Sequence, residues 1–125
     1  MIFGIGTDIV AVARMAEYWQ RHGERGLEKM LAPDEREACR GSHDPARFLA
    51  KRFAAKEALG KALGTGVRAP VLLPDIAVKH DDFGKPDFAF APTLAAHLAE
   101  RGLTAHLSIS DEQDYAVAFV ILETL

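Results

Sequence analysis

The segment Pro45–Leu63 most constrains the fold, because both of its ends carry clear helix signals. Asp44 is placed to cap the first turn, and Pro45 suits the first helical position, where the missing N–H has no intrahelical acceptor. Gly64 is the residue type that most easily takes the left-handed conformation that ends a helix. The sequence therefore predicts one long helix, which is the best-defined element of the chain.

Shorter elements are expected on both sides of this helix. Apolar or alternating patterns bounded by turn residues predict strands at residues 2–7, 75–80, 87–90, 104–110 and 115–122. Periodic patterns bounded by Pro or Gly predict helices at residues 12–22, 33–40 and 92–101, with a short turn of undetermined type at 26–30. These elements predict an α+β fold: a small, mostly antiparallel sheet with several helices, one of them long.

Length, charge and cysteine content limit the class of protein. A chain of 125 residues is long enough for one domain with a hydrophobic core, so residues 1–125 are expected to form a single domain. The net charge of −3, with histidines neutral, argues against a general nucleic-acid binder. No apolar run approaches the ~20 residues of a membrane span. The lone Cys39 excludes a disulfide framework and favours a reducing, cytoplasmic compartment.

The last strand pattern, YAVAFVIL at residues 115–122, is apolar throughout. A strand with two apolar faces is buried inside a sheet or packs against another chain. This segment therefore predicts a central strand or a seam between subunits.

Basic residues gather along the long helix. Six lie between residues 47 and 68 against the single acid Glu57, which gives this segment a charge of +5. Such a segment attracts an anionic ligand, although a solvated helix face has the same composition. Glu57 and Lys61 are one helical turn apart, so they form either a surface ion pair or part of a ligand site.

Asp8 ends the first strand pattern, on the strand face that also carries Gly4 and Gly6. Asp8 either caps the following helix or joins Glu57 in a Mg²⁺ site. Mg²⁺ prefers few carboxylates together with substrate phosphate oxygens, so two acids and Lys61 are sufficient for a diphosphate site.

Two other groups of polar residues have both a functional and a structural interpretation. The GTG sequence at residues 64–66 offers backbone N–H groups to a phosphate, but glycine also ends helices. On the strand at 104–110, His106 and Ser108 share the polar face, which fits a ligand contact or a structural role.

A stripe of three residues marks one side of the first predicted helix. Arg14, Tyr18 and Arg21 are spaced by four and three residues, so they lie on one face. This stripe fits a contact surface for an acidic protein or an ordinary solvated face.

Three motifs together resemble one known family. They are FGIGTDIV at residues 3–10, RFLAKRFAAKEALGKALGTG at 47–66 and HLSISDEQDYAVAFVILE at 106–123. In this order, and with the F-x-x-K-E-A-x-x-K pattern of residues 53–61, they are similar to the holo-acyl-carrier-protein synthases, the small 4'-phosphopantetheinyl transferases. The resemblance covers nearly the whole chain and implies a 4'-phosphopantetheinyl transferase-like fold.

The resemblance also implies a reaction. The family transfers the 4'-phosphopantetheine group of coenzyme A to a serine of apo acyl carrier protein and releases adenosine 3',5'-bisphosphate, in support of fatty acid biosynthesis. Mg²⁺ is then the cofactor and coenzyme A the co-substrate. Asp8 and Glu57 match the family's magnesium ligands, Lys61 the lysine beside the diphosphate, and His106 the histidine of the late strand motif. A homotrimer with each coenzyme A site between subunits is implied as well.

Individual contacts follow from the same resemblance. The expected catalytic residues are Glu57, Lys61 and His106. The expected coenzyme A contacts are Lys61, Gly64, Thr65, Gly66, Lys85, His106 and Ser108. Arg14 and Arg21 become the expected contacts to the acidic carrier protein. The group that accepts the serine proton is left open between Glu57 and a metal-adjacent water.

Two other functions remain compatible with the same residues. One is a different Mg²⁺-dependent enzyme that hydrolyses free nucleotide and leaves the carrier protein unmodified. The other is a non-catalytic carrier-binding module, in which Glu57 and Lys61 form only a helix ion pair.

Overall fold

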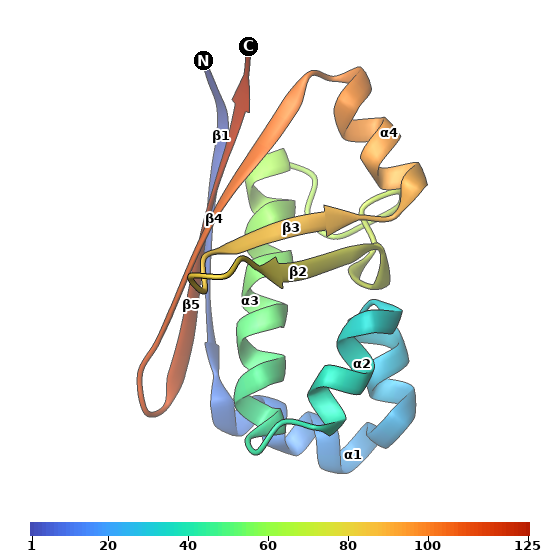
Figure 1. Cartoon of the computed structure of the whole chain (residues 1–125), viewed down its shortest axis with the longest axis vertical. Helices are drawn as coiled ribbons and strands as arrows, with labels where there is room; N and C mark the ends of the chain where they lie inside the picture. The colour runs from blue at the N-terminus through green and yellow to red at the C-terminus, as the bar shows by residue number, and fades with distance from the viewer.

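The computed structural model describes all residues 1–125 as four α-helices and five strands (Figure 1). In chain order the elements are β1 (Ile2–Ala11), α1 (Val12–Met30), α2 (Pro33–Arg40), α3 (Pro45–Leu63), a 3-10 turn η1 (Leu73–Asp75), β2 (Ile76–His80), β3 (Pro86–Phe90), α4 (Pro92–Glu100), β4 (Leu103–Asp111) and β5 (Tyr115–Thr124). The predicted α+β class is confirmed. None of the helices has both the length and the apolar character that crossing a membrane requires.

The strands form two antiparallel sheets. The larger sheet has the order β1-β5-β4, and β2 pairs with β3 in a separate hairpin. The prediction that the apolar segment at 115–122 is a central strand is therefore confirmed. Helix α3 packs on one face of the larger sheet, which we call its inner face; the opposite face is the outer face. Helices α1 and α2 lie together against α3 on the side away from the sheet (Figure 1).

The long helix has the ends that the sequence predicts. The Asp44 carboxylate accepts a hydrogen bond from the backbone N–H of Arg47 at 3.1 Å, which satisfies one free donor of the first turn. Gly64 ends the helix in the left-handed conformation, with φ of 81°. More than half of the residues of α3 are buried, because the helix lies between the sheet and the other helices.

Close packing of α3 on β1 depends on two glycines. A Cβ atom at Gly6 would overlap the carbonyl oxygen of Ala58, and one at Gly4 would overlap that of Ala62. Without these side chains, the strand backbone lies directly on the helix backbone. This contact fixes the position of the strand relative to α3.

The predicted turn at residues 26–30 is wrong. Helix α1 continues to Met30 and is interrupted at Gly23, where φ is 55° and ψ is −138°. Beyond this break, the Tyr18 hydroxyl donates to the carbonyl of Gly26 at 2.9 Å, and Arg36 donates to the carbonyl of Glu28. These contacts stabilise a second helical stretch that its local sequence does not indicate.

Strand β1 is longer than predicted, which changes the position of Asp8. The strand runs to Ala11, so Asp8 lies inside it rather than at its end. Ala11 occupies the N-cap position of α1, and no side chain caps that helix. The interpretation of Asp8 as a helix cap is therefore wrong.

Candidate active site

The structure brings together Asp8, Glu57 and Lys61, which we call the carboxylate–lysine cluster. Lys61 Nζ donates to Asp8 Oδ1 at 3.0 Å and to the Thr7 carbonyl at 2.9 Å. The ion pair of Lys61 thus joins α3 to β1. The alternative interpretation, a surface ion pair between Glu57 and Lys61 within the helix, is wrong.

The two acids of the cluster are close enough to influence each other. Partial burial raises the pKa of Glu57, and the nearby Asp8 charge raises it further, while Lys61 and Arg14 act in the opposite direction. Two carboxylates thus repel each other where water is partly excluded. A divalent cation would remove this repulsion, and carboxylate oxygens are the ligands that Mg²⁺ prefers. The residues present therefore fit a Mg²⁺ site.

The turn after α3 lies next to Lys61. Gly64 donates its N–H to the carbonyl of Lys61 and Gly66 donates to that of Gly60, both at 3.0 Å. These two N–H groups are engaged within the turn, so the phosphate cradle that the GTG sequence suggests is not formed by them in this conformation. The Thr65 side chain is exposed at the same turn.

A surface hollow of about 350 Å³ lies along α1, and we call it the α1 hollow. All three residues of the predicted stripe line it: Arg14, Tyr18 and Arg21. The Arg14 guanidinium lies 5.3 Å from the ring centre of Phe53, which also lines the hollow. Its rim is therefore basic and part of its wall apolar, which suits a partner with acidic and apolar side chains.

His106 and Ser108 do not join the carboxylate–lysine cluster within one chain. Both side chains lie on the outer face of the larger sheet, whereas Asp8 and α3 are on its inner face. His106 Nε2 is 2.9 Å from Glu123 Oε1, and His106 lines a hollow of about 230 Å³ together with Lys85. The predicted contacts thus form two separate groups in the single chain.

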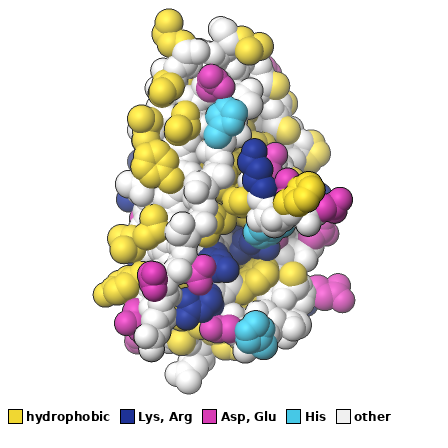
Figure 2. All heavy atoms as spheres, turned by 60° about the vertical axis from the view of Figure 1, so that its left-hand side comes forward, with side chains coloured by type: hydrophobic (Ala, Val, Ile, Leu, Met, Phe, Trp, Pro, Cys, Tyr) yellow, Lys and Arg dark blue, Asp and Glu magenta, His cyan; other side chains and the backbone are white.

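The outer face of the larger sheet exposes many apolar side chains. They include Phe3, Ile5, Ile9, Tyr115 and Phe119, contributed by β1 and β5. Figure 2 shows hydrophobic side chains along the side of the molecule that this sheet forms, next to a hollow with basic side chains. A continuous apolar face of this kind typically packs against another protein surface.

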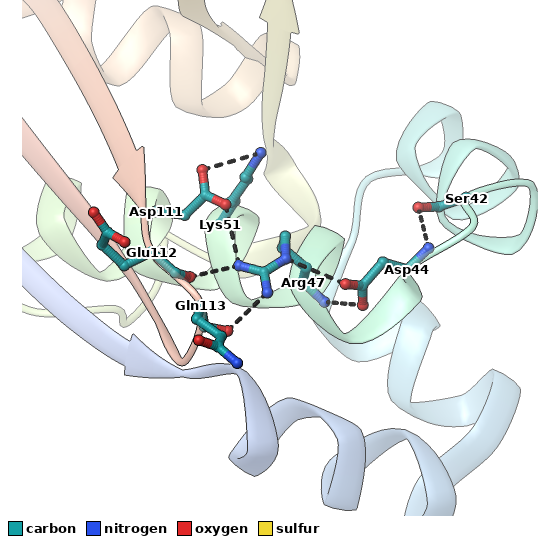
Figure 3. A network of polar contacts seen from close by, with 7 residues as sticks. All are labelled: Ser42, Asp44, Arg47, Lys51, Asp111, Glu112 and Gln113. Carbon is teal, nitrogen blue, oxygen red and sulfur yellow. Dashed lines mark hydrogen bonds and ion pairs between the residues drawn. The ribbon is translucent and has the colours of Figure 1, made fainter.

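Several basic residues of α3 have acidic or carbonyl partners within the chain. Arg47 donates to the Asp111 carboxylate and to the carbonyls of Glu112 and Gln113, which fastens the β4–β5 turn to the start of α3 (Figure 3). Lys51 lies 3.5 Å from the same Asp111 carboxylate. Part of the positive charge in the first half of the basic segment is therefore paired within the chain, and the expectation that this segment attracts an anion stays a prediction.

Sequence reasoning also missed a buried ionic network. Glu35 from α2 accepts a hydrogen bond from Lys56 Nζ at 2.7 Å, and Arg52 Nε lies 3.0 Å from the other Glu35 oxygen. Burial lowers the pKa of Lys56 to about 8, and the charge of Glu35 opposes this shift. In the sequence, Glu35 is one of two acids in the first turn of α2, a common position for acids, so only its place in the fold reveals this role.

Comparisons with known proteins agree on one family. Residues 4–120 match the model of the 4'-phosphopantetheinyl transferase superfamily. Holo-[acyl-carrier-protein] synthases from Azoarcus sp. strain BH72 and Dechloromonas aromatica are 60% and 62% identical to the chain. The Azoarcus match covers 99% of this chain and 99% of the relative, and the Dechloromonas match covers 98% of each.

Solved structures give the same result. The crystal structure of holo-[acyl-carrier-protein] synthase from Neisseria meningitidis superposes with a TM-score of 0.95 at 43% identity, over 99% of this chain and 100% of that one. The synthase from Bacillus anthracis, solved in complex with CoA (3',5'-ADP), has a TM-score of 0.84 at 37% identity, over 100% and 99% of the two chains. The chain therefore belongs to the holo-[acyl-carrier-protein] synthases of the 4'-phosphopantetheinyl transferase superfamily and is a phosphopantetheinyl transferase.

Proposed function

We propose that the chain transfers 4'-phosphopantetheine from coenzyme A to a serine of apo acyl carrier protein, in the cytoplasm and in support of fatty acid biosynthesis. The observation that carries this proposal is the carboxylate–lysine cluster, because it combines two hard oxygen ligands with a cation beside them. Phosphoryl transfer depends chiefly on positioning and on charge stabilisation, and this cluster offers groups for both.

The reaction exchanges one phosphorus–oxygen bond for another. The serine oxygen bonds to the phosphorus of the phosphopantetheine phosphate, and the bond from that phosphorus to adenosine 3',5'-bisphosphate breaks. The serine proton leaves to water or to the Glu57 carboxylate. Lys61 is the catalytic cation of the cluster and stabilises the negative charge that develops on the leaving phosphate.

Asp8 and Glu57 would hold Mg²⁺, which when bound supplies positive charge to the diphosphate of coenzyme A. Without that charge the two acids repel an anionic substrate. Lys61 alone, already paired with Asp8, neutralises little of the diphosphate charge.

The α1 hollow would receive the acyl carrier protein. Arg14 and Arg21 supply positive charge at its rim, and Arg21 is free to exchange its exposed pair with Glu17 for a carboxylate of the carrier. Arg14 also influences the pKa of Glu57, so the same surface lies beside the reacting groups.

Product analysis tests this function. The protein should release adenosine 3',5'-bisphosphate from coenzyme A only when apo carrier protein is present, one molecule for each carrier modified, and a carrier with its acceptor serine replaced by alanine should give none. Release without a carrier would support a nucleotide hydrolase instead. Binding of the carrier without release would support a non-catalytic module.

We further propose that three copies assemble through the outer faces of their larger sheets, with each site between two subunits. This assembly would cover the exposed apolar side chains of β1 and β5. It would also let Lys85, His106 and Ser108 of one copy contact coenzyme A held at the cluster of the next, with His106 acting in catalysis there. Lys61 and the turn at Gly64, Thr65 and Gly66 would contact it from the cluster's own chain.

A charge on the sheet face should break this assembly. We expect the Phe119→Asp variant to change from a trimer to a monomer and to lose transfer activity, because a carboxylate in an apolar interface is strongly unfavourable. Light scattering should give about three times the 13.6 kDa chain mass for the parent protein. Phe83→Asp is the matched control, because Phe83 is 97% exposed on the β2–β3 turn and lies outside this face. A Phe119→Asp variant that stays trimeric would refute the interface.

Mixing two inactive variants tests whether sites are shared between subunits. Glu57→Gln and His106→Ala remove groups that the proposed assembly places on opposite sides of one site. After subunits are exchanged, a trimer that contains both variants should have at least one intact site and regain activity. If mixing restores nothing while trimers form, each site belongs to a single chain.

A further inference from the structure

Lys56 is the largest fully buried side chain of the protein, and its ammonium group is fully engaged. It has no solvent exposure, and Nζ donates to the carbonyl of Met30 at 2.7 Å, to Glu35 at 2.7 Å and to the carbonyl of Leu73 at 3.1 Å. An ammonium group has three protons, so each is used once. Lys56 on α3 thereby connects the end of α1, the start of α2 and η1.

Two of these acceptors also shape the α1 hollow. Met30 and Leu73 both line it: Met30 is the last residue of α1, the helix that also carries Arg14 and Arg21, whereas Leu73 is distant from that helix in sequence. Their carbonyls are held from beneath by Lys56, which is not itself among the lining residues. The position of this wall therefore depends on a side chain that no partner can touch.

Glu35 completes the arrangement on the other side of Lys56. Its carboxylate accepts hydrogen bonds from the backbone N–H of Ala32 at 3.0 Å and of Val78 at 2.9 Å. The pair thus also fixes the connection that follows α1 and the middle of β2. Buried ion pairs contribute little net stability compared with apolar replacements, whereas they define geometry through their directed bonds.

Lys56 and the carboxylate–lysine cluster are held by different contacts. Lys56 and Glu57 are adjacent on α3 and point about 100° apart around the helix. Glu57 belongs to the face that packs near Asp8, and the position of that face is set by the close approach of Gly6 to Ala58. Loss of Lys56 should therefore move the wall of the hollow more than it moves the two carboxylates.

We propose that Lys56 is a positioning residue for the carrier protein: through the carbonyls of Met30 and Leu73 it holds the α1 hollow in the shape that the carrier contacts. This inference rests on the proposed function, which assigns the α1 hollow to the carrier. Lys56 would thus contribute to recognition of the carrier without touching it.

Steady-state kinetics with each substrate varied in turn test the proposal. Lys56→Met keeps the length of the side chain and removes the three donors, and a triple variant, Glu35→Leu with Arg52→Met and Lys56→Met, removes all three charges of the buried network. For both proteins we expect the KM for the carrier to rise about tenfold, with the KM for coenzyme A within about twofold of the parent value. Lys51→Met is the matched control, because Lys51 is on the same helix and pairs with Asp111 at the surface.

The outcomes separate this inference from the function on which it rests. A parent protein that does not modify the carrier contradicts the proposed function itself. If the parent is active and the triple variant keeps the parent's carrier KM, Lys56 only stabilises the fold and the inference is wrong. The same is true if the KM values for both substrates rise together. Should Lys56→Met alone fail to fold, the triple variant decides, since it removes Lys56, Glu35 and Arg52 together and leaves none of these buried charges without its partner.

Discussion

The Glu57→Gln variant is expected to lose phosphopantetheine transfer by at least about a hundredfold, without losing stability. Glutamine has the same shape as glutamate and cannot supply the negative charge that holds a divalent cation. Glu57 is a group whose ionised form the fold disfavours, because burial and the Asp8 charge both raise its pKa. The substitution therefore removes a charge that the reaction needs and that the fold does not.

The stability of this variant should depend on pH in a defined direction. When folding raises the pKa of a carboxyl group, its ionised form destabilises the folded state, and this effect is greatest at pH values above the raised pKa. Relative to the parent, Glu57→Gln should therefore have an equal or higher melting temperature at pH 7, and the difference should vanish as the pH falls below the unfolded value of about 4.3. Thermal unfolding at several pH values, with chelator present, measures this.

Glu37→Gln provides the control, because Glu37 is exposed on α2, away from the carboxylate–lysine cluster. It should retain full activity. A Glu57→Gln protein that retains transfer would show that the charge of Glu57 is not required. One that is inactive because it unfolds would show that the role of Glu57 is structural.

Gly6→Ala should destabilise the protein by about 3 kcal/mol and lower its melting temperature by about 10 °C or more. The added methyl group would overlap the Ala58 carbonyl oxygen and lie 2.7 Å from the Ala62 nitrogen, and both are backbone atoms that cannot turn aside. Strand β1 would have to move off α3, and Asp8 would move with it. Any folded Gly6→Ala protein should therefore also have reduced activity.

Denaturant unfolding of Gly6→Ala and Gly41→Ala compares this effect with that at a glycine where a methyl group would make only ordinary van der Waals contacts. Gly41 has φ of −82°, and a Cβ atom there would lie 3.6 Å from the carbonyl oxygen of Glu37. Gly41→Ala should be close to neutral. Equal stability of Gly6→Ala and the parent would mean that the close contact between β1 and α3 is not needed.

Local signals predicted those parts of the fold that are stabilised locally. Asp44, Pro45 and Gly64 define the ends of α3 through contacts within a few residues, so the sequence alone locates this helix. The second half of α1 was missed because its carbonyls are bound by the side chains of Tyr18, Arg36 and Lys56, which lie outside that half and, for Lys56, on a different helix 26 residues away. Contacts of that kind leave no local pattern.

In the candidate site, too, features set by local sequence were predictable, and features set by contacts between distant segments were not. The spacing of Glu57 and Lys61 places them on one helix face, but their interpretation as an ion pair failed because Lys61 reaches Asp8 on β1. The positive charge of α3 suggested one anion site, and pairing of Arg47 with the β4–β5 turn could not be foreseen from helix periodicity. Family resemblance selected Asp8, Glu57 and Lys61 together, and the structure places them beside one another.

The intact mass of apo acyl carrier protein after incubation with this protein and coenzyme A, in Mg²⁺ or in excess EDTA, tests the central claim most directly. With Mg²⁺ the carrier should gain the mass of one phosphopantetheine group, about 340 Da by its covalent composition. In EDTA the gain should disappear, and added Mg²⁺ should restore it, because Asp8 and Glu57 would otherwise face the diphosphate without a cation. A full gain of mass in EDTA would contradict the assignment of these two acids as metal ligands.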